Sequence, residues 1–255
     1  MRKSQFVMVV VMMAMAVITT SCVTRQSVFE KTVTETRQIK GFEEIEINGS
    51  PTVYYTQADK FSVTVKGPES QVENIITEKS GKALVIRNKG KIGFVNFQLG
   101  DEGELTVYVT SPDLTGIRLN GSGDFISDRR IDTDKIDIML RGSGDIDVKD
   151  VICDRCNVEL IGSGDIDLDR VDTQELSASL IGSGDIDLHL WNTADTRLAL
   201  KGSGDIKATF HDNCDAVECE LRGSGDIDLK GEVKHFSKEK SGSGDVSVGQ
   251  LTVRP

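Results

Sequence analysis

Aromatic residues and histidines are scarce in this sequence of 255 residues, and acidic residues outnumber basic ones; each of these features excludes a class of protein. Aromatic residues make up only 5%, so the hydrophobic core must be built mainly from Ile, Leu, Val and Ala. The three histidines, His189, His211 and His235, are scattered in sequence, which argues against a histidine-based catalytic or zinc centre. The formal net charge of −11 argues against binding to nucleic-acid phosphates, so no nucleic-acid partner is expected.

Cysteine and proline are also infrequent. Five cysteines are too few to indicate a disulfide scaffold. No proline lies between Asp113 and Arg254, so every residue of this stretch can donate a backbone hydrogen bond to a strand ladder. Hydrophobic residues make up 38% of the chain, and together with 25 glycines they give a globular composition, which excludes a disordered or multi-pass membrane protein.

The N-terminus has the three parts of an export signal. Arg2 and Lys3 precede an almost wholly apolar run over residues 6–18, which is shorter than the roughly 20 residues of a membrane-spanning helix. The following Ser21-Cys22 resembles a bacterial lipobox, in which the peptide is cut before the cysteine and the sulfur carries a lipid. We therefore predict a lipoprotein signal peptide over residues 1–21, lipidation of Cys22 and a lipid anchor in the membrane. A plain secretory signal or a retained anchor is the alternative.

Residues 22–40 contain Thr, Ser, Gln and mixed charges with little apolar periodicity. This composition predicts a tether between the lipid and the folded body. The segment Val23–Gln26 carries no acidic run of the kind that some lipoproteins use for surface export. We expect an exported outer-membrane lipoprotein that faces either the periplasm or the cell surface.

A repeat of about 20 residues fills the second half of the chain. Apolar residues alternate after each repeated tetrapeptide, as in Ile146 and Val148, and before the next one, as in Ile136, Ile138 and Leu140. This period-two pattern predicts two short strands in each unit. The tetrapeptide is Gly-Ser-Gly-Asp, and its seven copies begin at Gly121, Gly142, Gly162, Gly182, Gly202, Gly223 and Gly242.

Stacking of these units predicts an all-β fold. One unit cannot bury its apolar face alone, whereas units stacked about 4.8 Å apart share a core and pair each strand with its copies. Such pairing is parallel, and the coil is expected to be right-handed. Leucine-rich repeats have a similar period, but their L-x-x-L-x-L-x-x-N pattern is absent. The sequence therefore predicts a parallel β-helix solenoid with coils of about 20 residues over residues 119–255.

Residues 41–118 are β-rich but irregular, and we expect them to cap the N-terminal end of the solenoid. The segment Asn48-Gly49-Ser50-Pro51 resembles an eroded copy of the repeated tetrapeptide, and residues 68–76 are compatible with one short helix. One continuous body is expected, rather than two independent domains. Strands are predicted at residues 45–47, 52–55, 61–65, 83–86 and 105–109.

The repeated glycines are interpreted as structural corners. A sharp corner between strands needs a positive φ or a close backbone approach, and glycine permits both. Phosphate binding is the competing interpretation, but a G-x-G-x-x-G loop needs a third glycine and a following helix. The segment Gly121–Ile126 lacks the third glycine and leads into a strand.

Acidic residues concentrate on the repeats, where residues 121–255 carry 28 acidic and 16 basic side chains. In register, the Asp of each tetrapeptide forms one column, and the Asp two places later forms a second. Like charges about 4.8 Å apart repel by roughly 1 kcal/mol in water, so the repulsion should be offset. One interpretation is that corner amides and serine hydroxyls hold the first column, while water solvates the second.

Weak Ca²⁺ or Mg²⁺ sites on carboxylate oxygens are the second interpretation of these columns, and no other cofactor is expected. A close Asp pair could alternatively act in general acid/base chemistry, as in glycosidases. The candidate cation ligands are the paired aspartates of four repeats, namely Asp145, Asp147, Asp165, Asp167, Asp185, Asp187, Asp226 and Asp228.

Cysteine and tryptophan each supply one further candidate. Cys153 and Cys156 lie at a turn of one coil and could form a disulfide if that turn is tight. Cys156 and Cys219 fall at inward positions and are expected to serve as small core residues. Trp191, the sole tryptophan, lies within a predicted turn. It could stack on a sugar or pack over the end of its coil.

The repeated Gly-Ser-Gly-Asp-Ile corner, the alternating apolar residues and the lipobox-like start resemble the family described as putative auto-transporter adhesin, head GIN domain. The resemblance covers residues 41–249 and implies a β-helical fold in the cell envelope of a Gram-negative bacterium. It brings no established catalytic residues.

Three functions are compatible with the sequence. The leading hypothesis is an envelope-anchored, non-catalytic binding or adhesion module, whose extended β-helix surface binds a glycan or a protein. The second is a polysaccharide-active enzyme, because pectinase-type enzymes also use parallel β-helices. The third is a structural envelope protein without a soluble ligand. The sequence does not indicate an oligomeric state.

Overall fold

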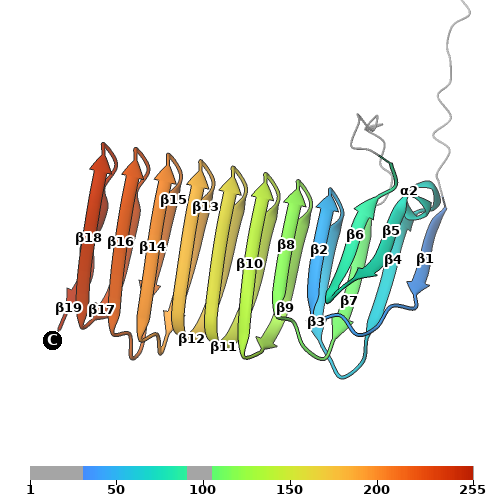
Figure 1. The fold of residues 1–255 in the computed structure, drawn as a ribbon, viewed down its shortest axis with the longest axis horizontal. Helices are drawn as coiled ribbons and strands as arrows, with labels where there is room; N and C mark the ends of the chain where they lie inside the picture. The colour runs from blue at the N-terminus through green and yellow to red at the C-terminus, as the bar shows by residue number, and fades with distance from the viewer. Residues whose placement is uncertain (1–30, 91–104, 255) are drawn as a thin grey trace, which may run out of the picture. The chain divides into compact units, whose positions relative to one another are not determined.

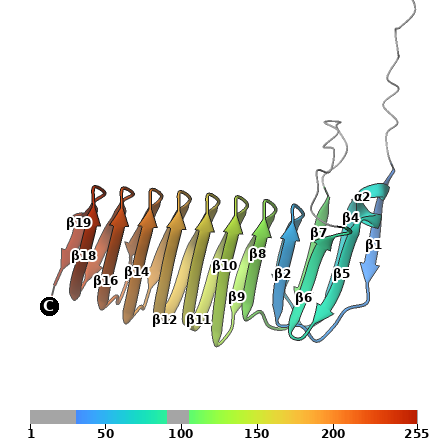
Figure 2. The same ribbon diagram turned by 45° about the horizontal axis from the view of Figure 1, so that its top comes forward.

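The alternation of apolar residues produces two sheets that face each other across a shared hydrophobic interior (Figures 1 and 2). The computed structural model describes residues 31–90 and 105–254, so the predicted signal peptide and Cys22 lie outside the described residues. We call the sheet that contains the strands following each Gly-Ser-Gly-Asp corner the post-corner wall. The sheet that contains the strands preceding each corner is the pre-corner wall.

Two 18-residue strands, β11 (Asp145–Gly162) and β12 (Asp165–Gly182), contribute their first halves to the post-corner wall and their second halves to the pre-corner wall. The other strands of the post-corner wall are, in spatial order, β1 (Thr32–Arg37), β4 (Ser62–Pro68), β7 (Thr106–Ser111), β3 (Thr52–Gln57), β9 (Asp124–Asp132), β13 (Asp185–Trp191), β15 (Asp205–Phe210), β17 (Ile227–Val233) and β19 (Val246–Val253). Those of the pre-corner wall are β5 (Ile75–Ser80), β6 (Ala83–Asn88), β2 (Glu44–Gly49), β8 (Gly116–Gly121), β10 (Lys135–Gly142), β14 (Asp195–Gly202), β16 (Ala216–Gly223) and β18 (His235–Gly242).

The seven tetrapeptides stack along one edge of the solenoid, as their spacing predicts (Figure 1). Each first glycine pairs in register with the first glycine of the next coil, and Gly49 of the eroded copy pairs with Gly121. Gly142 has a φ of 140°, and a Cβ on it would overlap the carbonyl oxygen of Gly121. The edge is therefore too tightly stacked for any other residue at this position.

The core consists of columns of inward side chains. Ile138, Val158, Ala178, Leu198 and Cys219 occupy equivalent positions in successive coils and are all buried. Each side chain packs on its copies above and below, so apolar contact continues from coil to coil. This explains how units too small to fold alone form a stable body.

The N-terminal region departs from chain order. The coil formed by β2 and β3 lies between the layer of β6 and β7 and the layer of β8 and β9. Strands β1, β4 and β5 pair antiparallel with their neighbours, and the short helix α2 (Glu69–Glu73) falls within the predicted helical segment. The predicted tether over residues 22–40 is wrong for Thr32–Arg37, because this segment pairs with β4 as strand β1 and belongs to the folded body. These elements end the parallel stacking at the N-terminal side. Across the described ranges, no helix has the length and apolar character needed to span a membrane.

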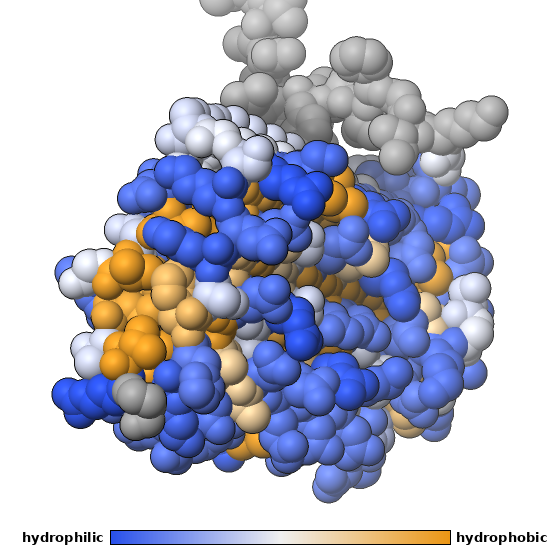
Figure 3. Space-filling view, turned by 60° about the vertical axis from the view of Figure 1, so that its left-hand side comes forward, coloured by the Kyte–Doolittle hydropathy of each residue, from blue (hydrophilic) through white to orange (hydrophobic). Residues whose placement is uncertain are grey.

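The C-terminal end of the solenoid presents β18 and β19. Lys238 and Lys240 occupy inward positions equivalent to Cys219 and Leu221 of the preceding coil. Charged side chains at an open sheet edge disfavour pairing with another sheet. Figure 3 shows hydrophobic residues on one side of this end; of the last strand, Val253 is 47% exposed.

Candidate functional site

The Asp column at the corner is tied to the backbone. The Asp165 amide donates to Asp145 Oδ1 at 3.1 Å, and the Asp185 amide donates to Asp165 Oδ1 at 2.9 Å. The same contact recurs at the next three coils, where the distances are 3.0, 2.9 and 2.7 Å. Each carboxylate thus accepts a charge-assisted hydrogen bond from the following coil, which offsets the repulsion along the column. This contact matches the interpretation that corner amides hold the first column. The hydroxyls of Ser203 and Ser224 contact each other, at 3.0 Å.

A second row of side chains points outward from the middle of the post-corner wall. Strand pairing aligns two tyrosines, one isoleucine and three aspartates in this row. We call these residues the outward row: Tyr108, Tyr54, Ile126, Asp147, Asp167 and Asp187. Lys207 follows Asp187 and separates it from Asp228, so the predicted acidic column is interrupted there.

The tyrosine end of the outward row offers an aromatic surface. The rings of Tyr54 and Tyr108 stack with centroids 5.7 Å apart and planes inclined by 21°. Tyr108 is 44% exposed, which is high for a large hydrophobic residue in this protein. A ring exposed in this way can contact an apolar sugar face while its hydroxyl remains in water.

The carboxylates at the aspartate end of the outward row repel one another and are partly desolvated. Partial desolvation between neighbouring coils raises the pKa of Asp167 above its ordinary value, and the charges of Asp187 and Asp147 raise it further. The pKa of Asp147 is raised by desolvation and by Asp169, while Lys149 opposes this effect. These carboxylates are therefore favourable acceptors for hydroxyl or cationic partners.

Metal coordination by the acidic residues stays a prediction. Among residues 31–90 and 105–254, no group of three or more His, Cys, Asp or Glu side chains is arranged to hold a metal ion. The corner aspartates Asp145, Asp165, Asp185 and Asp226 each use Oδ1 to accept a backbone hydrogen bond. Any cation would have to use the remaining oxygens of neighbouring coils.

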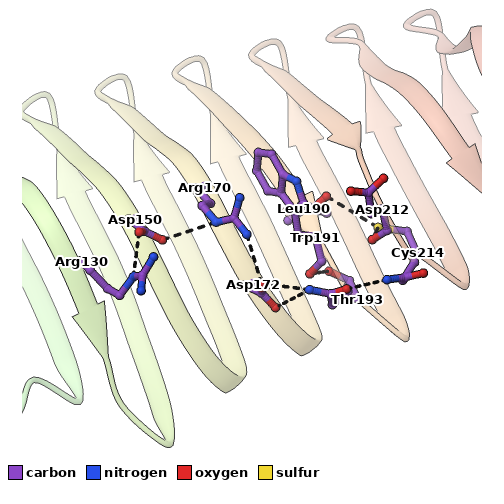
Figure 4. Close-up of polar contacts among 11 residues, drawn as sticks. Arg130, Asp150, Arg170, Asp172, Leu190, Trp191, Thr193, Asp212 and Cys214 are labelled. Atoms are coloured by element: carbon purple, nitrogen blue, oxygen red, sulfur yellow. Dashed lines mark hydrogen bonds and ion pairs between the residues drawn. The ribbon is translucent and has the colours of Figure 1, made fainter.

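A polar ladder crosses five coils near the other end of the post-corner strands (Figure 4). Arg130 Nε donates to Asp150 Oδ2 at 2.8 Å, and Arg170 Nε lies 3.7 Å from Asp150 Oδ1. Asp172 accepts from Arg170 at 3.3 Å and from the Asn192 amide at 2.9 Å. The ladder ends where Asn213 donates to Asn192 Oδ1 at 2.8 Å. These hydrogen bonds and ion pairs link neighbouring coils, although Asp150 Oδ1 and Arg170 Nε are buried without a hydrogen-bond partner.

Trp191 ends strand β13 rather than lying in a turn, because the alternation continues to the strand end with Leu190 inward and Trp191 outward. The His211 ring stacks on its indole at 3.9 Å with planes inclined by 4°. The Arg170 guanidinium lies 4.5 Å from the ring centroid. Arg170 lies in β12, and His211 directly follows β15; these strands flank β13 on opposite sides, so both faces of the ring are covered. Packing therefore accounts for Trp191, and sugar stacking on its faces is blocked.

Two histidines that are 22 residues apart meet on the surface beside Trp191. His189 Nδ1 lies 3.2 Å from His211 Nε2, and Asp187 Oδ1 lies 3.8 Å from His189 Nε2. Desolvation, followed by the nearby His189, lowers the pKa of His211. The contact between His189 and His211 could have been predicted from the sequence, because a separation of 22 residues is close to the length of one coil. The stacking of Tyr54 on Tyr108 had no such signal, because those strands do not follow each other in chain order.

Two surface depressions accompany these features. One, of about 360 Å³, lies on the pre-corner wall beside Arg118, Asn157 and Glu159. The other, of about 350 Å³, lies at the corner opposite the tetrapeptides and is lined partly by Cys153 and Asp172. Neither joins a nucleophile to a base in a recognisable catalytic arrangement.

Known proteins provide an independent comparison. The family model described as putative auto-transporter adhesin, head GIN domain, matches residues 41–216 and 192–255. No curated protein matches the chain.

Solved structures share the fold. A putative adhesin from Bacteroides fragilis has 27% identity and a TM-score of 0.75, over 85% of this chain and 96% of that chain. A putative lipid-binding protein from Parabacteroides distasonis has 24% identity and a TM-score of 0.62, over 85% of this chain and 97% of that one. A putative adhesin from the same species has 18% identity and a TM-score of 0.65, over 86% and 97% of the two chains. The last two show similarity of fold alone.

Proposed function

Because this chain belongs to the putative auto-transporter adhesin, head GIN domain family, we propose that it is an adhesion module of the cell envelope that binds a glycan through the outward row. A non-catalytic binding role agrees with the family and with the related putative adhesin from Bacteroides fragilis. The lipid anchor at Cys22 and the outer-membrane location are part of this proposal. They rest on the sequence of residues 1–22.

The observation that carries the proposal is the continuity of the outward row. Exposed Tyr108 and its stacked partner Tyr54 lie on one line of the wall with Asp147 and Asp167, and Ile126 separates the rings from the carboxylates. Aromatic rings bind the apolar faces of sugars, and carboxylates accept hydrogen bonds from sugar hydroxyls. The two chemistries thus occupy one row across successive coils, an arrangement suited to an extended chain.

Anchoring strengthens such binding. A lipid at Cys22, joined to the folded body by the residues that precede β1 (Thr32–Arg37), would hold many copies of the module at one membrane surface. Several weak contacts would then act together, because tethering raises the effective concentration of each site. A single module can therefore bind weakly and still support adhesion.

A glycan array combined with polysaccharide-cleavage assays tests the proposal on the purified chain. We expect retention of one or more glycans and no cleavage products. The Tyr108→Ala variant should lose binding, while Glu159→Gln, on the pre-corner wall, should keep it. Cleavage products would support the enzyme hypothesis instead, and the absence of both binding and cleavage would support a structural role.

The dependence of the binding affinity on salt concentration reports the charge of the ligand and provides a second test. If a basic protein rather than a glycan is bound, the affinity should fall steeply as salt rises, since exposed charge pairs are screened. Glycan binding through a ring and hydroxyl groups should change little with salt. A steep fall of the affinity with salt would indicate that the ligand is a protein rather than a glycan.

A further inference from the structure

Cys153 and Cys156 lie on the two sides of one tight corner, on the side of the solenoid opposite the tetrapeptides. The amides of Asp154 and Arg155 both approach the carbonyl oxygen of Asp134, at 2.9 and 3.4 Å, which bends the chain between the cysteines. Asp154 and Arg155 are exposed, whereas Cys153 is 7% exposed and Cys156 is fully buried. Both thiols therefore point into the same interior corner, although only two residues separate them.

Among the described repeats, only this corner has a cysteine at both of its inward positions. The equivalent pairs of the neighbouring coils are Thr133 with Ile136, Thr173 with Leu176 and Thr193 with Thr196. In those coils a threonine occupies the first inward position of the corner, and an apolar residue or a second threonine occupies the other. Packing alone therefore does not require two cysteines here.

The two thiols interact, and their environments differ. The hydrogen bond with Cys156 lowers the pKa of the Cys153 thiol and outweighs the raising effect of burial. The same hydrogen bond and complete burial raise the pKa of Cys156. Cys153 also borders the surface depression of about 350 Å³, which gives a reactant a route to this corner. The arrangement has the two parts of a thiol–disulfide couple, an attacking thiol near the surface and a resolving thiol behind it.

We propose that Cys153 and Cys156 form a redox pair, which a disulfide oxidant converts into a disulfide that locks the corner of this coil. The structure shows both cysteines as free thiols, the reduced state of this pair. Exported proteins meet disulfide oxidants, so the oxidised state is expected after export.

The reaction proceeds by two exchanges. The Cys153 thiolate attacks one sulfur of the oxidant, breaks its S–S bond and releases one thiolate, which takes up a proton. Cys156 then loses its proton to water, and its thiolate attacks Cys153 Sγ and displaces the second half of the oxidant as a thiolate, which takes up a proton. The chain loses two electrons and two protons, and the oxidant gains both.

The other two described cysteines provide internal controls. The Cys214 thiol lies 3.7 Å from the carbonyl oxygens of Leu190 and Asp212, and burial raises its pKa (Figure 4). Burial also raises the pKa of Cys219, to about 12. Neither lies beside a second sulfur, so neither should react under the same conditions.

The test treats the folded chain with glutathione disulfide, then denatures it, alkylates the remaining thiols and maps them by peptide mass spectrometry. We expect the peptide containing Cys153 and Cys156 to be unalkylated and lighter by two hydrogen atoms, with Cys214 and Cys219 alkylated. Cys156→Ala should instead accumulate a glutathione adduct on Cys153, and Cys219→Ala should keep the disulfide. Complete alkylation of Cys153 and Cys156 in the treated wild-type chain would overturn the proposal, as would equal oxidation of Cys214.

Discussion

The tetrapeptide edge offers a sharp test of the fold, through substitution of Gly142 by alanine. A positive φ of 140° at this position costs a non-glycine residue about 1–3 kcal/mol. The new Cβ would also overlap the Gly121 carbonyl oxygen, so the backbone of two coils would have to separate. We therefore expect the free energy of unfolding to fall by about 3–5 kcal/mol, a large fraction of the 5–15 kcal/mol typical of a folded domain.

Urea unfolding followed by circular dichroism measures this loss, and three glycines provide matched controls. Gly249→Ala meets no atom within 4 Å and should change stability by less than about 0.5 kcal/mol. Gly81→Ala has a φ of 60° without any overlap, so it isolates the conformational cost. Gly144→Ala overlaps the carbonyl of Gly123 without a positive φ, so it isolates the steric cost. If Gly142→Ala were no worse than Gly249→Ala, the stacked edge would be refuted.

Three further predictions concern the post-corner wall. Trp191→Ala should lower the free energy of unfolding by about 1–2 kcal/mol, because the contacts with His211 and Arg170 are lost, and it should leave glycan binding intact. The raised pKa of Asp167 means that its contribution to stability is greatest below the ordinary value of 3.8 and is lost as pH rises through the raised value. Asp167→Asn should therefore raise the melting temperature at pH 7 and have little effect in acid. If the aspartate columns bind Ca²⁺, millimolar calcium should raise the melting temperature, and a chelator should reverse the change; no response to either would exclude calcium binding.

The repeated half of the chain was predictable because its signal is local and periodic. The spacing of Gly121, Gly142 and Gly162 defines the coil, and the alternation around Ile146 and Val148 defines which side chains face inward. Even the eroded copy at Gly49 could be recognised, and the structure places it in register with Gly121. Each of these inferences needs only the pairing of identical units.

The N-terminal layers were not predictable in the same way. The order of β6, β2 and β8 depends on pairing between strands that are far apart in sequence, and no residue pattern records that order. The stacking of Tyr54 on Tyr108 follows from this order, so the aromatic end of the outward row could not be predicted from the sequence. For Trp191 the sequence left packing and sugar stacking open, and the contacts with Arg170 and His211 that favour packing come from two neighbouring coils.

Titration of a glycan selected on the array into the wild-type chain and three variants tests the central functional claim most directly. If the glycan binds on the outward row, Tyr108→Ala and Asp167→Asn should each weaken binding by about tenfold or more, the equivalent of about 1.4 kcal/mol or more. Glu159→Gln, on the other wall, should leave the affinity unchanged. Equal affinities for all four proteins would show that the ligand binds away from the outward row.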